Sequence, residues 1–72
     1  MSITPEQLTN WFTYHSPTES DQVGYLAIRQ AGLDLALAIV HNTPSSADQT
    51  AAIRKVREAV MTANAAIACK GA

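Results

Sequence analysis

Three flat side chains with polar atoms lie within five positions of each other: Trp11, Tyr14 and His15. They surround a break between two predicted helices, so they need not all point into a core. Rings of this kind can stack on nucleotide bases, and each stacked base contributes roughly 1–3 kcal/mol without demanding a particular base. The ordinary alternative is that Trp11 and its neighbour Phe12 fasten a short helix to the rest of the fold, and for Phe12 we favour that structural role.

Arg29 is the only cation in the first 53 residues, and it lies within a predicted helix. An arginine can anchor a phosphate through its planar guanidinium group. It can equally be a solvated side chain that pairs with Asp21, with Asp34 or with a neighbouring subunit. The pattern favours neither interpretation.

Motifs for catalysis or metal binding are absent from the sequence: there is no nucleophile elbow, glycine-rich phosphate loop or metal-ligand cluster. His15 and His41 fall at the ends of predicted helices without a carboxylate at helical spacing, and His41 suits the C-terminal end of a helix dipole. Met61 and Cys69 are expected to be packing residues. We therefore expect no catalytic activity, no cofactor and no metal.

The composition indicates a small protein that needs a partner. Its 72 residues form at most one domain, and 47% of them are hydrophobic but only 15% are charged, against roughly 25% in an ordinary soluble domain. The net charge of -1 argues against DNA binding, which needs many cations on one face. All five basic residues lie at or after Arg29, so a small anionic ligand stays open.

Nothing in the sequence resembles a targeting segment. The N-terminal residues lack a basic region followed by an apolar run, and the longest apolar stretch, Leu35–Val40, is too short to span a bilayer. The single cysteine cannot form an internal disulfide. We expect a cytoplasmic protein that does not enter a membrane.

Two helix starts are visible in the first twenty residues. Residues 4–7 (Thr-Pro-Glu-Gln) form a capping box with proline at the first helical position, which predicts a short helix ending near Phe12. Pro17 then breaks the chain, because a residue before proline avoids helical angles. Thr18 can cap a second helix, expected over residues 19–41.

The second helix has more apolar surface than one partner helix could cover. Its main stripe runs from Tyr25 to Ile39 at alternate steps of three and four residues. A second apolar set lies on a different side of the helix. Oligomerisation is the simplest explanation of this surface. The second set consists of Leu26, Leu33, Leu37 and Val40.

A third helix follows a tight turn at residues 42–45. Residues 46–49 (Ser-Ala-Asp-Gln) form a capping box that opens this helix, which ends before Gly71. Alanines on its inner side allow a close approach to the second helix. We predict an all-α fold in one domain, residues 1–72: a short N-terminal helix, then a long antiparallel helical hairpin, assembled as a homo-oligomer.

Several segments together resemble the phage anti-CBASS protein 2 family, which consists of small helical-hairpin sponges for cyclic oligonucleotides. The match covers nearly the whole chain. Its most specific parts are the Tyr-His-x-Pro-Thr break and the Ala-Asn-Ala-Ala-Ile-Ala run that ends the third helix. The matching segments are residues 11–18, Tyr25 with Ile28-Arg29, residues 44–46 and residues 63–68.

The resemblance implies a non-enzymatic homohexamer that sequesters cyclic nucleotides in the infected bacterial cell. Cyclic dinucleotides would bind between the N-terminal parts of adjacent subunits, and their loss would leave CBASS immune effectors inactive. By position, Trp11 and Tyr14 correspond to base-stacking aromatics, and His15 to a polar neighbour of that pocket. Arg29 stands where the family often has a phosphate-contacting lysine.

The family also binds cyclic trinucleotides in separate pockets near its three-fold axes. The residues of this sequence that stand in that region are Asn64, Cys69 and Lys70. Cys69 replaces an arginine of the family, and Lys70 follows one residue later. We therefore expect weaker trinucleotide binding than in members that keep the arginine.

A function of a different class remains as the alternative. The second apolar stripe could bind a helix of another protein, which would make the chain a structural or adaptor oligomer. A cyclic dinucleotide should raise the melting temperature of a sponge and leave that of an adaptor unchanged.

Overall fold

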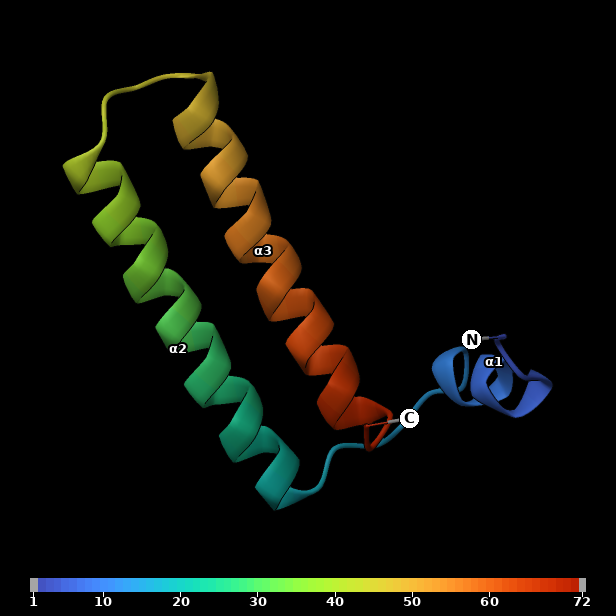
Figure 1. Ribbon diagram of the computed structural model, residues 1–72. Helices are drawn as coiled ribbons and strands as arrows, with labels where there is room; N and C mark the ends of the chain where they lie inside the picture. The colour runs from blue at the N-terminus through green and yellow to red at the C-terminus, as the bar shows by residue number, and fades with distance from the viewer. Residues whose placement is uncertain (1, 72) are drawn as a thin grey trace.

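The computed structural model describes residues 2–71, which form three helices (Figure 1). Helix α1 spans Pro5–Trp11, α2 spans Glu19–Asn42 and α3 spans Ala47–Ala68. Helices α2 and α3 lie side by side and antiparallel, whereas α1 lies apart from them, beyond the C-terminal end of α3. The predicted all-α fold, a short helix followed by a long hairpin, is confirmed.

The first two helices begin at the predicted N-cap residues, and the second cap has a return bond from Asp21 that the sequence analysis did not predict. The Thr4 hydroxyl accepts a hydrogen bond from the Gln7 backbone N–H at 3.2 Å, and the Gln7 side chain accepts one from the Thr4 N–H at 2.9 Å. Thr18 and Asp21 form the same reciprocal pair at 3.1 and 3.0 Å. Each helix therefore begins with two of its exposed N–H groups satisfied.

Only one of the two hydrogen bonds of the capping box predicted at the start of α3 is present, so that prediction is half wrong. Ser46 accepts from the Gln49 backbone N–H at 3.1 Å, but the Gln49 side chain does not return to Ser46. Its amide nitrogen instead donates to the carbonyl and the hydroxyl oxygen of Thr43, each at 3.2 Å. The tight turn brings the carbonyl end of α2 within reach of Gln49, and that carbonyl needs a donor.

Two glycines let α2 and α3 pack closely. A methyl group added at Gly32 would stand 2.6 Å from Val60 Cγ2, and one added at Gly24 would stand 3.2 Å from Ile67 Cδ1. The backbone of α2 at these glycines therefore lies against the Val60 and Ile67 side chains of α3. A larger residue at either glycine would push the helices apart. Little volume remains between the helices for a core.

The single chain encloses almost no core. Among residues 2–71, only Cys69 is buried, with 8% of its surface exposed. The radius of gyration is 15.3 Å, against about 11 Å for a compact domain of this length. The accessible surface is 5700 Å², against about 4,300 Å² for a compact protein of 7.7 kDa.

Apolar side chains occupy much of this surface. Leu26, Leu33, Leu37 and Val40, the predicted second stripe of α2, are all about half exposed. Phe12 is 86% exposed, so the structural role predicted for it, fastening α1 to the hairpin, is wrong within one chain. The chain turns at Phe12, the C-cap of α1, and this turn leaves its ring at the surface.

Helix α2 is long and apolar enough, by length and composition, to cross a membrane. No uninterrupted apolar stretch of α2 reaches this length, because Arg29 and Asp34 divide it. Soluble core helices and signal sequences meet the same criterion. Arg29 and Asp34 lie in the middle of α2, where a bilayer would make both charges costly.

Candidate functional site

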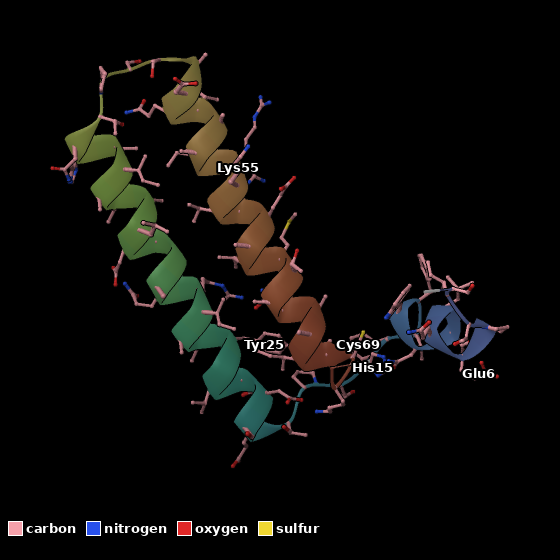
Figure 2. The ribbon with its side chains drawn as sticks, viewed as in Figure 1. Glu6, His15, Tyr25, Lys55 and Cys69 are labelled. Atoms are coloured by element: carbon pink, nitrogen blue, oxygen red, sulfur yellow. The ribbon has the colours of Figure 1, made fainter. Side chains whose placement is uncertain are left out.

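Asn10 connects α1, the following loop and the end of α3. Its side-chain nitrogen donates to the Cys69 carbonyl at 3.1 Å, and its own carbonyl lies 2.7 Å from His15 Nε2. The Cys69 sulfur lies 4.0 Å from the same carbonyl. Because a carbonyl only accepts, His15 Nε2 carries the proton. Figure 2 shows His15 and Cys69 together at this joint.

His15 therefore has one ring nitrogen committed to holding the loop, and its other nitrogen is the one available to a ligand. Sequence reasoning missed Asn10. Nothing in the sequence pairs it with Cys69, which is 59 positions away. A polar residue in the last turn of a short helix was the one available signal.

The aromatic side chains near the break differ in their surroundings. Trp11 is 41% exposed and borders a hollow of about 250 Å³ with residues from the last two turns of α3. Tyr14 is 82% exposed and belongs to the loop between α1 and α2. Tyr14 thus offers nearly its whole ring for stacking, whereas Trp11 also packs against the hairpin.

Lys70 is bound to the start of α2. Its ammonium group lies 3.1 and 3.2 Å from the two carboxylate oxygens of Asp21. The Thr18 backbone N–H, and then Lys70, hold the pKa of Asp21 below its ordinary value of 3.8. The ion pair joins the start of α2 to the residue that follows the end of α3, at the open end of the hairpin.

The end of α3 adopts a left-handed turn at Lys70, with φ of 57°. The Gly71 N–H donates to the Ala66 carbonyl at 2.9 Å and the Lys70 N–H to the Ile67 carbonyl at 3.2 Å, a Schellman cap. A left-handed conformation is costly for a residue with a Cβ; the two cap hydrogen bonds and the ion pair with Asp21 are the contacts that hold Lys70 in it. The backbone conformation at Lys70 therefore depends on a tertiary contact as well as on the local sequence.

The three residues predicted for trinucleotide binding are not equally accessible. Cys69 is buried against Asn10, and Lys70 is paired with Asp21. The side-chain oxygen of Asn64 is buried and has no hydrogen-bond partner among residues 2–71. Trinucleotide binding through these residues stays a prediction.

Arg29 lines a groove of about 330 Å³ between α2 and α3. Within the described part of the chain it pairs with neither predicted acid: Asp21 binds Lys70, and Asp34 accepts from the Gln30 side chain at 2.9 Å. A second arginine, Arg57 of α3, lines the same groove, and sequence reasoning did not single it out. The antiparallel register of the hairpin brings the two arginines to one groove.

One chain does not bring the predicted dinucleotide residues into a single pocket. Arg29 lies eight residues beyond Asp21, about 12 Å along α2, whereas Trp11 and His15 lie at the joint with the end of α3. Helix α1 projects away from the hairpin (Figure 1). A pocket containing both the aromatic rings and Arg29 would need a second copy of the chain.

One family profile, described as the Acb2/Tad1 hairpin domain, matches residues 4–68. The match includes α1, the break with Tyr14 and His15, both long helices and Arg29; Cys69 and Lys70 lie just beyond it. No curated protein and no solved structure gave a significant match. Since the profile covers nearly every element of the fold, the chain belongs to the Acb2/Tad1 family, the family of anti-CBASS protein 2.

Proposed function

We propose that the protein is a non-catalytic sponge for cyclic dinucleotides, which it sequesters so that CBASS immune effectors stay inactive. Family membership suggests a sponge-type, anti-CBASS function. The observation that carries the finer proposal is the Tyr14 ring, 82% exposed within the matched segment. A ring that buries nothing in its own chain is free to stack on a base.

Arg29 supplies the complementary charge. It makes no ion pair among residues 2–71, so its guanidinium group is available to a phosphate. An arginine preserves the positive charge of the family's lysine and adds a planar pair of donors. Base stacking by Tyr14 and phosphate binding by Arg29 would together recognise a nucleotide.

The pocket would form between copies of the chain. The surface exceeds that of a compact protein of the same mass by about 1,400 Å², and a standard interface buries about 800 Å² per partner. Association can therefore cover the exposed apolar stripe and enclose a ligand together. We infer a homo-oligomer, a hexamer by resemblance to the family, acting in the cytoplasm of an infected bacterium.

The proposal includes cyclic trinucleotides as ligands of lower affinity. A site on a three-fold axis would need a cation from each subunit to face three phosphates. Lys70 is the nearest cation to the missing arginine, and it is paired with Asp21. Trinucleotide binding would have to break that pair, so we expect it to be weaker than in members with the arginine.

Thermal unfolding with and without a cyclic dinucleotide tests the proposal. We expect 3′,3′-cyclic GMP–AMP or cyclic di-AMP to raise the melting temperature, and titration calorimetry to give one class of sites in fixed ratio to chains. The linear dinucleotide pApA is the control for the closed ring, because it has the same bases and the same number of phosphorus atoms as cyclic di-AMP. An unchanged melting temperature with the cyclic ligands would instead favour an adaptor that binds a protein helix.

A further inference from the structure

The groove that Arg29 lines is positively charged on both sides. Arg29 reaches it from α2 and Arg57 from α3, while its floor is apolar and includes Gly32, Val56 and Val60. Neither arginine forms an ion pair among residues 2–71. Two unpaired guanidinium groups thus border one apolar surface.

The register of the hairpin sets the spacing of the two charges. Gly32 faces Val60 most closely, and Gly24 faces Ile67, so Arg29 is level with α3 about five or six residues beyond Arg57. That offset corresponds to roughly 8–9 Å along the helix axes. The two arginines therefore enter one groove from opposite helices about one and a half turns apart, a spacing at which two long side chains can meet separate phosphates of one small ligand.

Among residues 2–71, no carboxylate lines this groove to neutralise the pair. Asp34 is hydrogen-bonded to Gln30, and Glu58 lines a different surface with Arg54 and Lys55. Figure 2 shows Lys55 on the outer side of α3, away from α2. Like charges beside an apolar floor repel each other, so an anion that bridges them is favoured.

We propose that Arg57 is a second phosphate-binding residue, so that Arg29 and Arg57 each bind one phosphodiester of the same cyclic dinucleotide. The inference rests on the proposed function and adds to it a reason for selecting two phosphates. The apolar floor matches the faces of the sugar and base rings, while the two guanidinium groups match the two charges. A cyclic mononucleotide could engage only one of them.

Arg57→Gln tests this assignment, with Arg54→Gln as the matched control. Arg54 lies one turn away on α3 and lines the other surface, with Lys55 and Glu58. We expect Arg57→Gln to weaken binding of 3′,3′-cyclic GMP–AMP about ten- to a hundredfold, because a charge-assisted hydrogen bond is lost. Arg54→Gln should change the dissociation constant by less than about twofold.

Three further measurements complete the test. Arg57→Lys should keep most of the affinity, since the charge survives. Arg29→Glu should abolish binding. Cyclic AMP, with one phosphate, should bind the wild type far more weakly than the dinucleotide and should lose less affinity than the dinucleotide does in Arg57→Gln.

The outcomes separate this inference from the proposed function. If the wild type binds no cyclic dinucleotide, the proposed function fails. If the wild type binds and Arg57→Gln binds equally well, only the role of Arg57 is overturned. If Arg57→Gln lowers the oligomeric mass in light scattering, the Arg57 side chain holds the assembly together rather than a phosphate, and the assignment is also overturned.

Discussion

Tyr14 is the residue for which function and folding can be separated most cleanly. With 82% of its surface exposed, it contributes little to the packing of its own chain. We predict that Tyr14→Ala weakens cyclic dinucleotide binding about ten- to a hundredfold, because one stacked ring contributes roughly 1–3 kcal/mol. Titration calorimetry measures the loss.

Tyr14→Phe is the control for this prediction, because it keeps the ring and removes only the hydroxyl. It should bind nearly as tightly as the wild type. Light scattering should show an unchanged mass for both variants. Equal affinity of Tyr14→Ala and wild type would mean that the ring belongs to an interface or to the turn.

Residue types were predictable from the sequence, but their partners were not. Tyr14, His15 and Arg29 could be proposed as ligand-binding residues because rings and an isolated cation have chemistry of their own. The contacts of Asn10 and the position of Arg57 depend on which turns of distant helices meet. That register follows from close packing at Gly32 and Gly24, which no local pattern encodes.

At the scale of elements, Asp21 has two roles. Its carboxylate accepts from the Thr18 N–H in the cap of α2 and binds Lys70 beyond the end of α3. Both contacts favour the ionised form, so the folded pKa lies below 3.8. The stability that these contacts add is therefore present above pH 3.8 and is lost as pH falls through the folded pKa.

We predict that Asp21→Asn lowers the melting temperature by a few degrees at about pH 7. The difference from the wild type should shrink as the pH falls below 3.8 and disappear once the pH is well below the folded pKa, where the wild-type carboxyl is protonated as well. Thermal unfolding of both proteins across this range checks the sign. A difference that does not change with pH would mean that the charge of Asp21 adds no stability.

The contact between α2 and α3 depends on the absence of a side chain at Gly32. Alanine at Gly32 would gain up to about 1 kcal/mol in helix propensity. It would also place a methyl group 2.6 Å from Val60 Cγ2, and overpacking of this kind costs about 1–3 kcal/mol. We predict that Gly32→Ala lowers the free energy of unfolding by about 1 kcal/mol, measured by urea denaturation.

Two variants test the physical reason. Gly24→Ala should be neutral or slightly stabilising, because its new methyl meets only the flexible end of Ile67 at 3.2 Å. Gly32→Ala should cost less when Val60 is already alanine, which a double-mutant cycle measures. Additive effects would show that no clash occurs.

Local sequence predicted the helices better than it predicted their connections. The caps at Thr4 and Thr18 depend on residues three positions apart, so the sequence alone was sufficient. Gln49 met the same local rule but bonded to Thr43 across the turn. The choice depended on the path of the loop, which the capping pattern does not describe.

At the scale of the whole molecule, a single chain leaves most of its large apolar side chains at the surface and encloses almost no interior. Composition predicted this imbalance, because few charges and many small apolar residues cannot cover a compact monomer. The placement of α1 could not be predicted in the same way. It follows from the hydrogen bond between Asn10 and Cys69 and from the turn at Phe12.

The exposed stripe of α2 leads to the prediction for the assembled protein. Leu37 lies within this stripe and is about half exposed in the single chain. If copies of the chain cover the stripe, a charge at Leu37 would be desolvated at the interface, and the assembly would dissociate. We predict that Leu37→Glu lowers the oligomeric mass at micromolar concentration.

Light scattering coupled to size exclusion should give the wild type a mass near six times the 7.7 kDa chain mass. The smallest mass consistent with the prediction is that of a dimer, twice the chain mass. Ala27→Glu is the control, because it adds the same charge on the face of α2 that carries Gln30 and Asp34. That variant should remain assembled. A folded wild-type monomer would contradict the prediction. So would flotation of the wild type with lipid vesicles, since lipid rather than a second copy would then cover the apolar face of α2.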